Sequence, residues 1–169
     1  GERTNPWMQE SSNKIIQQGE IVSFDTDMVG PYGYCADISR TFVCGNIFND
    51  IQKDLYSIAV NQINHNSSLI KDGTTFKEFI EKSWKLPKEY YGNRYSVMVH
   101  GIGLCDEWPS IRYPTDGGDK GGIFQKNMTI TVESYIGKVG GKEGVKLEQQ
   151  YLVGQNGLEL MSHHPLEDI

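Results

Sequence analysis

The feature that most restricts the fold of this chain is a pair of strand-like segments that carry aspartates and flank a tight turn. Residues 21–29 are rich in β-branched and aromatic side chains, a Gly-Pro-Tyr-Gly turn interrupts them, and residues 34–43 resume the same composition. Two such segments around a short turn predict a β-hairpin. Because side chains alternate along a strand, Asp25 and Asp27 leave the same face, and Asp37 lies on the returning strand. The pattern therefore predicts that three carboxylates converge on one patch.

The rest of the chain predicts two helices followed by strands. Apolar residues at helical spacing follow a capping box at Asn49, and a shorter set follows a second capping box at Thr75. Further strand-like segments are residues 95–104, 128–136 and 145–153, and a short apolar run follows at residues 158–161. Residues 105–126 form a long loop of the kind that is usually functional. This order predicts one α+β domain over residues 1–169, with an antiparallel sheet covered by two helices.

Charge and composition exclude several function classes. The formal net charge is −6 without any long basic run, so neither a nucleic acid nor an anionic membrane is an expected partner. No apolar run approaches the roughly 20 residues that cross a bilayer, and the first residues do not form an export signal. The three cysteines lack CxxC or CxxH spacing, which argues against a disulfide framework or a thiolate zinc site and favours the cytoplasm.

The acidic residues have the composition of a metal site. His100 precedes a Gly-Ile-Gly stretch, and Glu133 and Glu148 each sit in the middle of an apolar strand-like segment. Ionised carboxylates at close range repel one another unless a multivalent cation neutralises them. Oxygen-rich sites with a single imidazole suit manganese, iron or cobalt and, less exclusively, zinc. A single acid in a strand is more often solvated or salt-bridged than bound to a metal. The prediction of a metal site therefore depends on the acids and His100 occurring together.

Taken together, these motifs resemble the creatinase/aminopeptidase superfamily, whose fold is called pita-bread. The matching stretches are Phe24-Asp25-Thr26-Asp27, Gly33 to Phe42, His100-Gly101-Ile102-Gly103-Leu104, Glu133 and Glu148. The resemblance implies that two divalent metal ions are bound by Asp25, Asp27, Asp37, His100, Glu133 and Glu148. It covers only the C-terminal part of the pita-bread fold. We therefore expect a fragment that lacks the first half of the domain and any N-terminal domain, and whose uncovered edges favour a homodimer.

Two departures from the peptidase pattern indicate a different chemistry. Peptidases of the superfamily have one aspartate at the position of Thr26, whereas Asp25 and Asp27 flank that position here. They also usually carry a second histidine, used in peptide hydrolysis, where this chain reads Leu104-Cys105-Asp106-Glu107-Trp108-Pro109. Both departures resemble the dimethylsulfoniopropionate lyases of the DddP type. That resemblance implies iron as the favoured metal and Asp106 as the catalytic base.

The implied reaction is β-elimination of dimethylsulfoniopropionate, a small zwitterion, to dimethyl sulfide and acrylate. Its sulfonium group favours aromatic faces, so Tyr95 and Trp108, which bracket the histidine motif, are candidate substrate-binding residues, although packing roles fit them equally well. Cys105 is expected to be a small buried residue. Two alternatives stay open: a metallopeptidase that cleaves Xaa-Pro bonds, and a non-catalytic binding module, which the complete ligand set disfavours.

Overall fold

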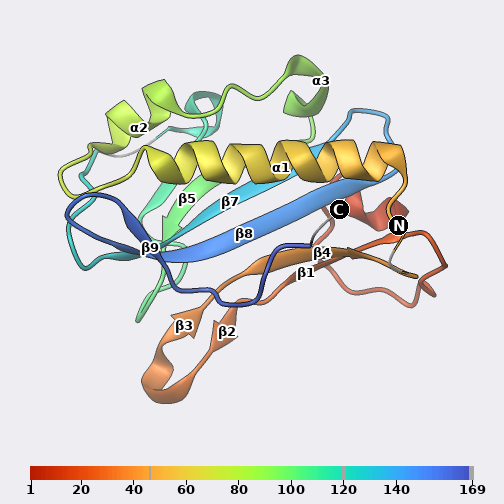
Figure 1. The fold of residues 1–169 in the computed structure, drawn as a ribbon, viewed down its shortest axis with the longest axis horizontal. Coiled ribbons are helices and arrows are strands. Elements are labelled where there is room, and N and C mark those ends of the chain that lie inside the picture. Colours follow the sequence, from red (N-terminus) through yellow and green to blue (C-terminus); the bar gives the residue numbers. More distant parts are fainter. Residues whose placement is uncertain (46, 119–120, 168–169) are drawn as a thin grey trace.

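The chain folds into a central sheet, which begins at residue 97, a helix over residues 50–68 that covers it, and a separate hairpin ribbon formed by residues 21–43. The computed structural model describes residues 1–45, 47–118 and 121–167 (Figure 1). Its helices and strands are β1 (Ile21–Asp25), β2 (Met28–Val29), β3 (Cys35–Ala36), β4 (Ser39–Val43), α1 (Asp50–Ser68), α2 (Phe76–Lys82), α3 (Lys88–Tyr91), β5 (Val97–Gly101), β6 (Ser110–Arg112), β7 (Thr129–Gly137), β8 (Gly144–Val153) and β9 (Leu158–Leu160). Within these described ranges, no helix has the length and apolar content needed to cross a bilayer.

The two predicted helices are confirmed, and their starts follow from local hydrogen bonds. Asn49 accepts a hydrogen bond from the backbone N–H of Gln52, and the Gln52 side chain accepts one from the backbone N–H of Asn49, each at 3.0 Å. Thr75 and Glu78 form the same reciprocal pair before α2. Each box satisfies donors that the first turn of a helix leaves unpaired. α2 ends at Lys82.

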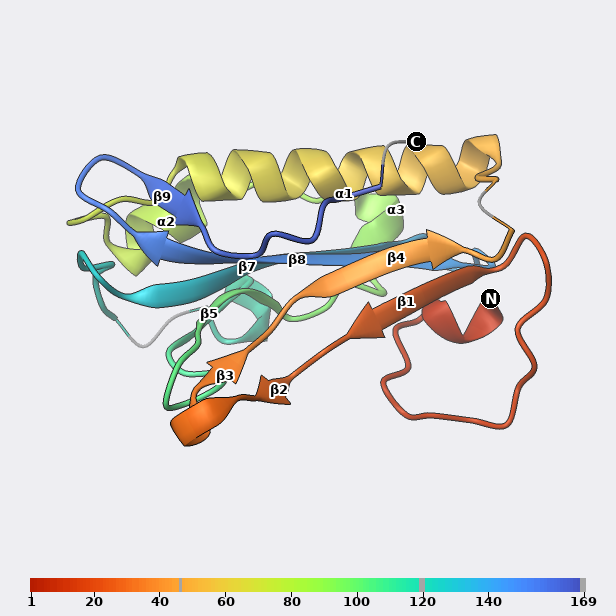
Figure 2. The same cartoon turned by 60° about the horizontal axis from the view of Figure 1, so that its bottom comes forward.

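The central sheet is antiparallel, with strand order β6-β5-β7-β8-β9. α1 packs on β7 and β8, and the β1–β4 ribbon contacts β8 on the side away from α1 (Figure 2). With both faces covered, β7 is buried along almost its whole length. The α+β class predicted from the sequence is confirmed. Polar side chains on the inner face of β7 and β8 are consequently held between two layers.

The hairpin is less regular than the sequence pattern predicts. β1 pairs with β4 and β2 pairs with β3, but the ladder breaks between these pairs. Asp27 lies in the break with φ of +26°, so it does not continue the strand alternation that begins at Asp25. The long loop of residues 105–126 also differs from expectation, since it contains β6, which pairs with the edge of β5.

Candidate metal centre

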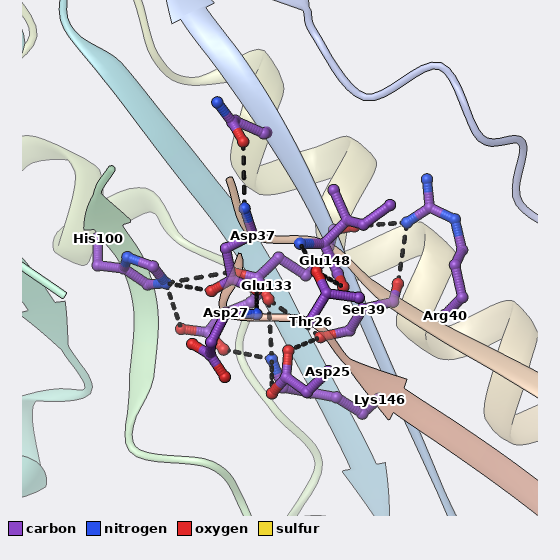
Figure 3. Close-up of polar contacts among 12 residues, drawn as sticks. Asp25, Thr26, Asp27, Asp37, Ser39, Arg40, His100, Glu133, Lys146 and Glu148 are labelled. Atoms are coloured by element: carbon purple, nitrogen blue, oxygen red, sulfur yellow. Dashed lines mark hydrogen bonds and ion pairs between the residues drawn. The ribbon is translucent and has the colours of Figure 1, made fainter. Parts of the chain in front are cut away.

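The six predicted ligand residues meet at the seam between the central sheet and the hairpin ribbon (Figure 3). The sheet contributes His100 from β5, Glu133 from β7 and Glu148 from β8. Glu133 and Glu148 are direct partners in the β7–β8 register, so their side chains leave one face side by side. The ribbon contributes Asp25, Asp27 and Asp37 from the end of β1 and from the break in the ladder.

The potential ligand atoms form two groups that share one carboxylate. Asp37, His100 and Glu148 each offer an atom within 4.8 Å of the others, and so do Asp25, Asp27 and Asp37. The Oδ2 atom of Asp37 lies 3.6 Å from His100 Nε2, whereas its Oδ1 accepts a 3.4 Å hydrogen bond from the backbone N–H of Asp27. Asp37 therefore belongs to both groups.

Short side chains hold the ribbon at the break. The Thr26 hydroxyl lies 3.1 Å from both the carbonyl oxygen and the N–H of Ile38, replacing ladder bonds that the kink removes. Ser39 Oγ lies 2.6 Å from Asp25 Oδ1 and 3.0 Å from Glu148 Oε2. This hydroxyl connects an acid of the ribbon with an acid of the sheet and fixes the separation of the two layers at the site.

The imidazole of His100 is oriented by its own strand. Its Nδ1 lies 3.0 Å from the carbonyl oxygen of Gly101, which suits a proton on Nδ1. Its Nε2 points into the acidic cluster, 3.1 Å from Glu148 Oε1 and 3.9 Å from Glu133 Oε1. A backbone acceptor at one ring nitrogen that leaves the other directed at carboxylates is the usual arrangement of a metal-binding histidine.

The glycine after His100 makes room for a backbone rather than for a ligand. A Cβ atom on Gly101 would lie 2.1 Å from the carbonyl oxygen of Trp108, and the Gly101 N–H donates to the carbonyl of Pro109 at 2.9 Å. Absence of a side chain here lets residues 105–109 pass close to His100. The glycine therefore positions the loop that carries Asp106.

Crowding of buried acids perturbs the titration of the cluster. Burial, followed by the charge of Glu148, raises the pKa of Asp37 to about 8, and burial raises the pKa of Glu133 to about 8. Burial opposes a charge on His100, but the hydrogen bond to Glu148 and the charge of Glu133 raise its pKa to about 10. The pKa of Glu148 is lowered, because Lys146 and His100 outweigh its burial. Without a metal ion, the cluster retains protons at neutral pH.

These residues fit a centre of divalent cations. The Oε1 atom of Glu133 is buried and, among the described residues, has no hydrogen-bond partner. A buried oxygen of this kind carries a desolvation cost that a metal ion relieves. The donor set, carboxylate oxygens with one imidazole nitrogen, is the set that suits manganese, iron, cobalt or zinc.

The raised pKa values predict how the metal-free protein responds to pH. Asp37 and Glu133 have pKa values of about 8 when folded, whereas unfolded carboxyl groups titrate near pH 4. Between these values the folded state binds more protons, so stability falls as pH rises, and His100 adds the same sign above about pH 6.5. We expect the Tm measured in chelator to fall steadily from about pH 5 to about pH 8.

Thermal unfolding of the Asp37→Asn variant provides the control for this prediction. Asparagine resembles the protonated acid, so the pH dependence of Tm should become shallower in the variant than in the wild type. A Tm that rises with pH over this window in chelator would contradict the assignment of Asp37 and Glu133 as buried, proton-retaining acids.

The other predicted functional residues lie around the cluster at different depths. Asp106 Oδ1 lies 3.8 Å from His100 Nδ1, and the Asp106 side chain is 26% exposed. The Tyr95 ring is half-buried, with the ammonium of Lys146 5.0 Å from its centroid. Trp108 is 58% exposed and lines a cavity of about 420 Å³ together with Glu107.

The expectation that Cys105 is a small buried residue is wrong. Its side chain is exposed, because the loop turns it outward.

Sequence reasoning missed two charged residues next to this centre. Lys146 is fully buried and contacts three of the acids. Glu107 Oε1 lies 4.0 Å from His100 Nε2, so this side chain faces the ring nitrogen opposite the one near Asp106. The position of Lys146, two residues before Glu148 in a strand, places both on one face and was the signal available in the sequence. Glu107 carried no comparable signal, because its placement depends on a φ of +60° within the loop.

Comparisons with known proteins agree with this geometry. The profile of metallopeptidase family M24 matches residues 1–155. A dimethylsulfoniopropionate lyase DddP of Roseovarius nubinhibens is 39% identical, with 99% of this chain and 38% of that protein aligned. An Xaa-Pro dipeptidase of Pyrococcus furiosus is 31% identical, with 90% of this chain and 42% of that protein aligned. The chain thus spans less than half the length of these relatives.

Solved structures show the same architecture. Prolidase from Pyrococcus furiosus superposes with a TM-score of 0.79 at 28% identity, covering 95% of this chain and 46% of the prolidase. X-Pro aminopeptidase from Thermotoga maritima superposes with a TM-score of 0.77 at 27% identity, covering 98% of this chain and 46% of that protein. The pita-bread architecture expected from the sequence is therefore confirmed. From its profile match and its fold, this chain belongs to metallopeptidase family M24.

Proposed function

We propose that this chain is the catalytic unit of a metal-dependent carbon–sulfur lyase that cleaves dimethylsulfoniopropionate to dimethyl sulfide and acrylate. The observation that carries the proposal is the surroundings of His100, where the loop supplies acids, Asp106 and Glu107, and no second imidazole from the described chain reaches the cluster. Of the other histidines, His65 bonds to the carbonyl of Lys82, and His163 and His164 are exposed in the tail. The identity to the DddP lyases supports the same reaction.

In this proposal the ligands are the six residues at the seam, with iron as the favoured metal. Five carboxylates and one imidazole provide enough donors for two divalent ions, with Asp37 facing both groups. Bound ions would supply Lewis acidity that acidifies the C–H bond next to the substrate carboxylate. Asp25 and Asp27 also line a groove of about 470 Å³ beside the seam.

Asp106 is the proposed base. It takes the proton from the carbon next to the substrate carboxylate, and the electrons of that C–H bond form the new C=C bond. The C–S bond breaks with its electron pair on sulfur, so neutral dimethyl sulfide and acrylate leave and the proton stays on Asp106. This step requires the Asp106 carboxylate within hydrogen-bonding reach of that carbon. Tyr95 and Trp108 are the proposed aromatic faces for the sulfonium.

Headspace detection of dimethyl sulfide tests this function. The full-length protein, reconstituted with ferrous iron and given dimethylsulfoniopropionate, should release dimethyl sulfide, and chelator should stop the release until iron is restored. If the folded, iron-loaded protein releases no dimethyl sulfide, the lyase function is contradicted.

The second candidate function is cleavage of Xaa-Pro bonds. It is favoured by the superposition on Pyrococcus furiosus prolidase, whose fold this chain shares. Xaa-Pro dipeptides given to the same iron- or manganese-loaded preparation separate the two candidates. Release of free proline without release of dimethyl sulfide would establish the peptidase.

A further inference from the structure

Lys146 is a buried cation beneath the acidic cluster (Figure 3). Its side chain is only 1% exposed, and its Nζ lies 2.6 Å from Glu133 Oε2, 3.3 Å from Glu148 Oε2 and 3.7 Å from Asp25 Oδ2. The ring of Tyr95 covers the ammonium at 5.0 Å. A lysine without solvent is tolerated only when it is closely paired, and here all three of its charged partners are proposed metal ligands.

In Glu133 and in Glu148, the two carboxylate oxygens have different surroundings: one faces Lys146 and the other faces His100. Glu133 presents Oε2 to Lys146, while its Oε1 has no hydrogen-bond partner in the described chain and lies on the side of His100. Glu148 likewise presents Oε2 to Lys146 and Oε1 to His100 Nε2. In both residues the oxygen near His100 remains available to a metal ion, because the ammonium holds the other oxygen.

We propose that Lys146 is a built-in counter-ion of the metal centre, which holds Glu133 and Glu148 in a fixed orientation before any metal binds. It is a positioning residue, since it acts through the two glutamates. Its role concerns metal binding alone, so it holds for a lyase and for a peptidase. Outer contacts of this kind change metal affinity by about 10- to 100-fold when they are removed.

The test is titration of manganese(II) into the metal-free, full-length protein by isothermal calorimetry. We expect Lys146→Met to weaken binding by at least about 10-fold, and Lys146→Arg, which keeps the cation, to stay within a few-fold of wild type. Lys138→Met removes an exposed lysine that pairs with Glu89, and it should leave manganese affinity unchanged. If Lys146→Met does not fold, Lys146→Gln, which keeps a donor but no charge, is expected to show the same loss.

Two results would overturn this role. Unchanged manganese affinity with a lowered Tm of the metal-free variant would make Lys146 a packing residue only. Tighter binding would show that the lysine mainly repels the metal ions and does not prepare their ligands.

Discussion

Asp37→Ala is expected to lose both metal ions and to reduce turnover by at least about 1,000-fold. Asp37 Oδ2 lies near His100 Nε2 and Oδ1 near the backbone of Asp27, so one side chain serves both groups of donor atoms. Its removal leaves each group short of a ligand at once. Metal catalysis of this kind contributes several kcal/mol to the transition state, which corresponds to a rate loss of that order.

Metal analysis of the purified variants measures this effect. Asp27→Ala is the matched control, because Asp27 belongs to only one of the two groups. We expect it to retain about one ion per chain, whereas Asp37→Ala retains close to none. The fold should survive, since burial and neighbouring acids raise the pKa of Asp37 and its removal relieves that repulsion. Two ions bound to Asp37→Ala would show that another residue bridges the groups.

Asp106→Asn is expected to reduce dimethyl sulfide release by about 100- to 10,000-fold without changing the metal content, because a positioned base contributes that much to proton transfer. Asparagine keeps an oxygen at Oδ1, which accepts the backbone N–H of Glu107 at 2.9 Å, so the loop should keep its shape. The readouts are headspace dimethyl sulfide and metal per chain, measured on the same preparation.

Glu107→Gln is the control for Asp106→Asn, since the two acids are adjacent and face opposite nitrogens of His100. We expect Glu107→Gln to retain most of the turnover. If the glutamine variant is inactive and the Asp106 variant is active, Glu107 is the base. Loss of metal from the Asp106 variant would instead make Asp106 a ligand.

The sequence predicted those parts of the molecule that depend on local rules. Both helix starts follow from reciprocal bonds between residues three apart, at Asn49 and at Thr75, and the antiparallel strands follow from composition and turns. β6 was missed because three residues beside a proline carry too little pattern, and its pairing with β5 is a tertiary contact. Local signals do not contain such contacts.

At the candidate site, the convergence of the acids was predictable but its geometry was not. The alternation rule placed Asp25 and Asp27 together, yet Asp27 reaches the cluster through a backbone kink that the rule does not describe. Lys146 was missed for a different reason. A lysine in a strand is ordinarily solvated, and only the two covering layers force this one inward.

The seam between the hairpin ribbon and the central sheet affects how cooperatively the protein unfolds. β1 and β4 form a sheet of their own, and they share no strand ladder with β8. Direct bonds across the seam come from side chains such as Thr41, whose hydroxyl pairs with the backbone of Lys146. Ions bound between the ribbon and the central sheet would therefore tie together two foldons that could otherwise open separately. In such a molecule, bound metal ions would also set the size of the cooperative unfolding unit.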